Sequence, residues 1–217
     1  YIYLVEDGEL FAGPLMLGLV VTLEITFYGL ILSMIIGLVT ALLRLSDSFF
    51  ARLLARGYLE LIRNTPLLIQ IFFLYFVLAP IFDLNRVFAG ILALSLFEGA
   101  YASEIFRAGI LSIQKGQWEA SHSLGLSTAN TYGHVILPQA IRRILPPLTS
   151  QAISLVKDSA LVSTIAVYDL TMEGRAIISF TFLTFEIWFT IAAIYLVVTV
   201  FLSMVVKYLE NRFKIMT

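Results

Sequence analysis

The chain has 217 residues, of which 59% are hydrophobic and only 13% charged, and its mean hydropathy is +0.92. A soluble domain averages about 45–50% apolar and about 25% charged residues. A core of this length cannot bury the excess, so lipid is the expected solvent. The net charge of −1 argues against nucleic acid as a partner, and the absence of cysteine excludes disulfides, thiolate nucleophiles and thiolate metal sites.

Five apolar segments predict an all-α membrane protein. A transmembrane helix needs about 20 predominantly apolar residues, and each segment meets or approaches that length. The fourth is the least regular, because Lys157 and Asp158 divide it into two shorter apolar runs. No repeat or Pro/Ser-rich linker interrupts the chain, so a single transmembrane domain over residues 1–217 is expected. In chain order the segments are Pro14–Leu43, Tyr58–Phe82, Val87–Ile105, Pro147–Leu170 and Ile187–Val206.

A proline near the start of the second segment leaves two structures open. Thr65 is a good helix cap, and Pro66 is a good first helical residue. The residue before a proline also disfavours the α region. The stretch from Phe49 to Ile62 is therefore either a separate elbow helix on the inner side or part of one long helix with a proline kink.

Lysine and arginine set the orientation, because cytoplasmic loops carry an excess of both. With the N-terminus outside, eleven of the fourteen lie on the inner side, and the opposite orientation inverts this bias. We therefore predict an external N-terminus and a cytoplasmic C-terminus. The outer stretch Thr171–Phe185 either lies along the interface or packs beneath an outer partner. The outer or intramembrane cations are Arg86, Lys157 and Arg175.

A polar island, EASHSLGLSTANTYGHVILP, covers Glu119–Pro138 and is predicted to be cytoplasmic. Lys115-Gly116 is expected to end the preceding helix, and Gln117–Leu124 to form about two helical turns. Glu119 falls in the expected first turn, where a negative charge suits the helix dipole. Gly125 suits a helix stop with positive φ. The alternative is an ordinary polar loop.

The island resembles the EAA loop of bacterial ABC importer permeases, here a loop of about residues 114–143. The pattern of EAA, three residues, Gly, nine residues and I-x-L-P is matched except at Ser121 and Val135. RNTPLLIQ from Arg63 and AYASEIFRAGI from Ala100 resemble the branch that handles polar amino acids such as histidine, glutamine and arginine, and opines. The resemblance implies a type I ABC importer permease fold in the bacterial inner membrane.

The same resemblance implies a set of partners. They are a second, identical or related permease chain, two ABC ATPase subunits that bind ATP and Mg²⁺, and an extracytoplasmic solute-binding protein. The chain itself is expected to be no enzyme and to hold no cofactor, and it lacks the G-x-x-x-x-G-K-[ST] phosphate loop. The island helix is expected to dock on the ATPase, with Trp118 and Leu124 as apolar anchors. The docking residues are predicted to be Trp118, Glu119, Ala120, Ser121, Leu124 and Gly125.

Ionisable residues deep in lipid cost about 2.5–3.5 kcal/mol each on insertion scales and usually face a cavity or a partner. Glu98 in the third segment, and Lys157 and Asp158 in the fourth, all fall near the membrane midplane at about 1.5 Å per residue. Gln151 and Ser154 share one helical face with Asp158. These five residues are the candidate site for the ammonium and carboxylate of an amino acid.

Other interpretations of these charges remain open. Glu98 or Asp158 alternatively only neutralises Lys157. The family pattern commonly has a small residue near position 98, so an acid there favours a cationic substrate. Glu104 and Arg107 are expected to form a local ion pair or part of an inner gate, and no metal site is expected.

The predicted function is the transmembrane subunit of an ATP-driven importer for polar amino acids, working by alternating access. The main alternative is an ion-coupled secondary transporter or channel, in which Glu98 and Asp158 bind protons or cations. A third alternative is an intramembrane enzyme in which Glu98 and Asp158 form an acid pair. No metal-ligand cluster or nucleophile–base pair in the sequence supports it.

Overall fold

The computed structural model describes residues 1–6 and 9–213. A short antiparallel pair of strands opens the chain, with β1 at Tyr3–Glu6 and β2 at Glu9–Ala12, and the sequence did not predict it. Helix α1 follows at Pro14–Leu45, with the proline at its first position. The turn before it needs glycine, because a Cβ on Gly13 would lie 2.3 Å from the carbonyl oxygen of Tyr1.

The second predicted segment is two helical stretches with a sharp bend between them. Helix α2 covers Phe49–Arg63, and its N-terminus is capped by Ser48, which accepts a bond from the Ala51 amide. After Pro66 the chain continues in a different direction, bent by 106° from α2. The elbow alternative is therefore the one observed. The continuation consists of α3 at Leu67–Phe72, a π-helical stretch at Phe73–Leu78 and α4 at Ala79–Phe82.

Helix α5, at Arg86–Leu111, lies at the centre of the molecule and packs along α1. Small residues allow the close approach. A Cβ on Gly37 would lie 2.7 Å from the Ala102 Cβ, and one on Gly99 would lie 2.9 Å from Ile36. Helices in lipid commonly pack through such small residues, because no hydrophobic force drives them together.

The polar island and the last third of the chain form the remaining helices. The bounds of the fourth predicted segment, Pro147–Leu170, were wrong. Helix α8 begins ten residues before Pro147 and ends at Asp158. A 3₁₀ stretch then turns the chain, and α9 packs on α1 and α10. The elements are α6 at Lys115–Ser123, α7 at Thr128–Thr131, a π-helical stretch at Tyr132–Ile136, α8 at Leu137–Asp158, the 3₁₀ stretch at Ser159–Ile165, α9 at Leu170–Thr181 and α10 at Thr184–Phe213.

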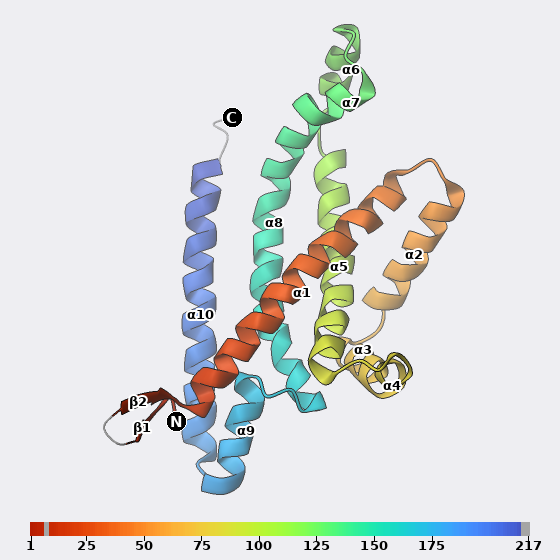
Figure 1. Cartoon of the computed structure of the whole chain (residues 1–217). Coiled ribbons are helices and arrows are strands. Elements are labelled where there is room, and N and C mark those ends of the chain that lie inside the picture. Colours follow the sequence, from red (N-terminus) through yellow and green to blue (C-terminus); the bar gives the residue numbers. More distant parts are fainter. Residues whose placement is uncertain (7–8, 214–217) are drawn as a thin grey trace.

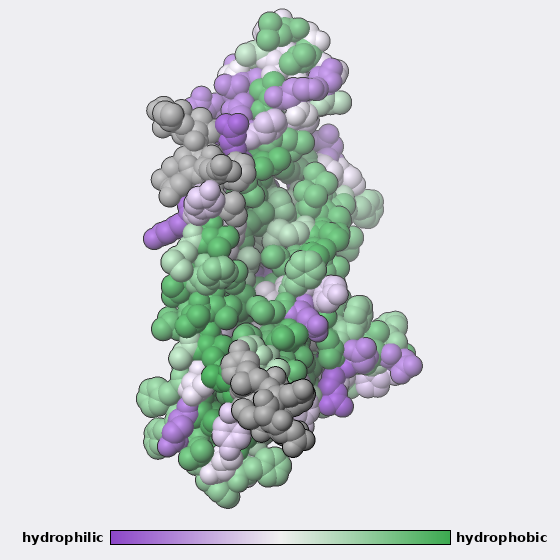
Figure 2. Space-filling model, turned by 60° about the vertical axis from the view of Figure 1, so that its left-hand side comes forward, coloured by the Kyte–Doolittle hydropathy of each residue, from purple (hydrophilic) through white to green (hydrophobic). Residues whose placement is uncertain are grey.

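The helices run between two ends of the molecule. Figure 1 shows α6 and α7 at one end, with β1, β2 and α9 at the other. Within the described residues, α1, α5 and α10 are long and apolar enough to cross a membrane, and the bent unit of α2 with α3–α4 is a fourth candidate. Helix α8, which contains the first half of the predicted fourth segment, is not among them, so a total of five spans is not supported by length and composition alone. Apolar side chains dominate the middle of the surface in Figure 2.

Candidate functional site

Glu98 lies in the middle of α5, twelve residues after Arg86, or about 18 Å along the helix. Its side chain is only 1% exposed. The Gln151 amide on α8 donates a hydrogen bond to its Oε2 atom. Oε1 is buried and has no hydrogen-bond partner among the described residues. An unsatisfied buried carboxylate oxygen is costly, which makes this atom a candidate for contact with a ligand.

Helix α8 carries four of the five predicted site residues, and one of these four is exposed. Asp158, at the end of α8, lies close to the Glu98 carboxyl. Ser154 is half-buried on the same helix, whereas Lys157 is exposed. No direct ion pair joins Lys157 to Glu98 or to Asp158 among the described residues. The structure thus places two acids and one amide at a single point between α5 and α8.

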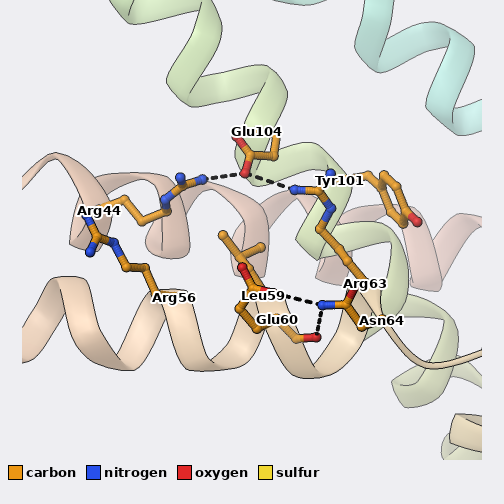
Figure 3. Close-up of a pocket in the computed structure, with 8 residues that line it drawn as sticks. All are labelled: Arg44, Arg56, Leu59, Glu60, Arg63, Asn64, Tyr101 and Glu104. Atoms are coloured by element: carbon orange, nitrogen blue, oxygen red, sulfur yellow. Dashed lines mark hydrogen bonds and ion pairs between the residues drawn. The ribbon is translucent and has the colours of Figure 1, made fainter.

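A second polar site lies nearer the α6 end, around Glu104. The predicted ion pair with Arg107 is present, with 3.3 Å between Arg107 Nη2 and Glu104 Oε2. Sequence reasoning missed two further arginines on other helices. Arg44 of α1 and Arg63 of α2 contact Glu104 Oε1 at 2.5 and 3.2 Å (Figure 3). One carboxylate therefore joins α1, α2 and α5.

The predicted docking residues of the island do not all face outward. Trp118 packs edge-on against Tyr132, with ring centroids 5.0 Å apart, and joins the apolar cluster around Ile113 and Ile136. Ser121 is also buried, at 3% exposed. The exposed members are Glu119, Ala120, Leu124 and Gly125.

The local geometry of α6 agrees with the sequence in one respect and differs in two. Gly125 has a φ of +73°, as expected for a helix stop. The preceding helix ends at Leu111, so Lys115-Gly116 begins α6 and does not break α5. Glu119 is consequently the fifth residue of α6, outside the first turn.

A comparison with known families and proteins places the chain. The model of the binding-protein-dependent transport system inner membrane component family matches residues 29–215. The glutamine transport system permease protein GlnP of Escherichia coli K12 is 40% identical over 209 residues, which cover 94% of this chain and 95% of that protein. The L-cystine transport system permease protein TcyB of Bacillus subtilis is 40% identical over 198 residues, covering 90% and 84%.

Solved structures agree with the fold. The crystal structure of an amino acid ABC transporter with histidines matches with a TM-score of 0.86 and 40% identity, over 92% of this chain and 94% of that one. An inward-facing structure of the MetNI methionine ABC transporter matches with a TM-score of 0.78 at 19% identity, covering 93% of this chain and 97% of that one, and this supports the fold alone. The predicted helical permease fold is confirmed. The chain belongs to the family of binding-protein-dependent transport system inner membrane components.

Proposed function

We propose that the chain is the permease subunit of an ABC importer for polar amino acids, and that a cationic side chain on the substrate is favoured. As a member of its family it is the inner-membrane component, not the ATPase. The named relatives transport glutamine and cystine, according to their names. The single observation that supports a substrate site in this chain is the buried Glu98 carboxylate, with one oxygen free of hydrogen-bond partners among the described residues.

The proposed substrate contacts follow from charge. The cationic side chain of the substrate donates hydrogen bonds to Glu98 Oε1 and to Asp158. The two acids then share its positive charge, and Glu98 Oε1 gains a hydrogen-bond partner. Gln151 holds the other Glu98 oxygen and fixes the carboxylate in place. Ser154 and Lys157 complete the proposed site on the side of the substrate carboxylate.

ATP hydrolysis is proposed to drive transport from the α6 end of the molecule. ATP and Mg²⁺ bind to two partner ATPase subunits, on which α6 docks through its exposed residues Glu119 and Ala120 and through its C-cap residue Leu124. A solute-binding protein delivers substrate to the opposite face, and a second permease chain completes the pathway. Closure of the ATPase pair moves α6, and the helices around Glu98 then open to alternate sides.

The test is substrate-stimulated ATP hydrolysis by the reconstituted complex with its binding protein. Glu98→Gln keeps the size of the side chain and removes the charge. We expect stimulation by arginine or lysine to need at least about tenfold more substrate, because a charge-assisted hydrogen bond contributes about 1.5–3 kcal/mol. Stimulation by glutamine is expected to fall less. Glu24→Gln is the matched control, because Glu24 is an exposed acid on α1.

Three outcomes speak against the proposal. If Glu98→Gln and Glu24→Gln respond alike to every amino acid, Glu98 does not contact the substrate. If Glu98→Gln affects neutral and cationic amino acids equally, the preference for a cationic side chain is wrong. Uptake that needs an ion gradient and no ATP would favour the secondary-transporter alternative.

A further inference from the structure

A pocket of about 310 Å³ opens beside Glu104, between α1, α2 and α5. At about 30 Å³ per water molecule, it holds a volume of several waters, enough for a phosphate group. Figure 3 shows Arg44 and Arg56 on one side of it and Arg63 with Tyr101 on the other. Its lining residues are Arg44, Arg56, Leu59, Glu60, Arg63, Asn64, Tyr101 and Glu104.

The charges around this pocket do not cancel. Glu104 is shared by Arg44, Arg63 and Arg107, and Glu60 accepts a bond from the Asn64 amide at 2.8 Å. Arg56 is exposed and forms no ion pair within the described part of the chain. The pocket lining contains two acids and three guanidinium groups, each with five N–H donors. Its surplus is about one positive charge, to which Arg107 adds a second by pairing with Glu104 from outside the lining. Planar guanidinium groups suit phosphate oxygens.

Helix α2 carries an apolar face on the side away from this pocket. Several large apolar side chains on it are more than half exposed, including Phe50 at 80% and Leu54 at 69%. A helix with arginines on one face and Phe and Leu on the other is typical of a membrane interface. The exposed apolar residues of α2 are Phe49, Phe50, Leu53, Leu54 and Leu61.

The depth of the pocket suits a lipid headgroup. Glu104 follows Arg86, at the start of α5, by eighteen residues, which is about 27 Å at 1.5 Å per residue. The hydrocarbon core of a bilayer is about 30 Å thick. If Arg86 marks one interface, the arginines lie where the headgroups of the opposite leaflet begin, on the side of α6 and α7.

We propose that this pocket binds the headgroup of an anionic phospholipid of the leaflet on the α6 side, with the phosphate on Arg44, Arg56 and Arg63 and the acyl chains directed toward the bilayer midplane. The phosphate neutralises the surplus charge. This site is distinct from the one around Glu98 and stands whether or not that site binds substrate.

The test is a lipid titration of the purified full-length chain in detergent, read by native mass spectrometry. Phosphatidylglycerol and phosphatidylethanolamine with identical acyl chains are compared. We expect phosphatidylglycerol to bind at least fivefold more tightly, and Arg56→Gln to weaken its binding about fivefold, since one arginine near an anionic lipid contributes about 1 kcal/mol. Arg56→Lys should lose less than Arg56→Gln.

Arg142→Gln is the matched control, because Arg142 is an exposed arginine on α8 outside the pocket, and it should leave the affinity unchanged. Equal affinity for both lipids, or equal loss in Arg56→Gln and Arg142→Gln, overturns the proposal. Displacement of the lipid by millimolar inorganic phosphate would mean a simple anion site. An efficient disulfide between two Phe50→Cys chains in membranes would mean that a second copy covers α2.

Discussion

Gly37 is tightly packed and Gly57 is not, and replacing each with alanine tests the helix packing at single residues. A Cβ on Gly37 would press on Ala102 at 2.7 Å and on the Gly99 carbonyl oxygen at 3.0 Å, whereas one on Gly57 meets nothing within 4 Å. We expect Gly37→Ala to destabilise the protein by about 1–3 kcal/mol, because backbone must move. Gly57→Ala should stabilise it by up to about 1 kcal/mol, since alanine favours helix.

Thermal unfolding of both variants in the same detergent measures these effects. The unfolding temperature of Gly37→Ala should lie below that of the unaltered chain, and that of Gly57→Ala at or above it. A Gly37→Ala chain as stable as the original would show that α1 and α5 do not pack as closely as described.

The sequence predicted individual charges better than their partners. Periodicity placed Gln151 on one helical face with Asp158, and the cost of a buried acid singled out Glu98. The bond between Glu98 and Gln151 depends on how α5 and α8 cross, which no local pattern encodes. Arg44 and Arg63 were missed for the same reason. Glu104 lies 60 and 41 residues from them, and only the packing of three helices brings the groups together.

At the scale of elements, the length of the apolar segments predicted α1, α5 and α10 well. It did not predict the bounds of less apolar helices. Helix α8 begins in the polar island and contains Pro146 and Pro147, so an apolar window detects only its second half. Pro66 marked a break correctly, but the 106° bend depends on where α2 and α3 pack. The β1–β2 pair was not foreseen, because strand pairing depends on contacts between segments that a helix-oriented search does not weigh.

Trp118 on α6 and Leu124, the residue that caps the helix, have different surroundings. Leu124 is 80% exposed, whereas Trp118 packs against Tyr132. We expect Leu124→Ser to lower the rate of ATP-driven uptake several-fold and to leave the unfolding temperature unchanged, because it removes only a docking contact. Trp118→Ala should lower the unfolding temperature, because a buried aromatic contact is lost.

Leu196→Ser is the control for exposed apolar side chains, because Leu196 is 63% exposed on α10, outside both proposed partner surfaces. It should keep ATPase coupling intact. Equal loss of uptake in Leu196→Ser and Leu124→Ser would assign the effect to general surface changes and would contradict docking through α6.

At the scale of the whole molecule, charge and shape combine into a prediction of topology. The excess of inner lysines and arginines predicts that α6 is cytoplasmic, and the structure puts α6 and α9 at opposite ends. Because the chain has no cysteine, each introduced thiol is the only one present. In intact cells, a membrane-impermeant maleimide should label Ser179→Cys on α9 and should label Ser123→Cys on α6 only after permeabilisation, both positions being exposed. The reverse pattern would invert the chain in the membrane, place the arginine pocket in the outer leaflet, and separate α6 from ATP.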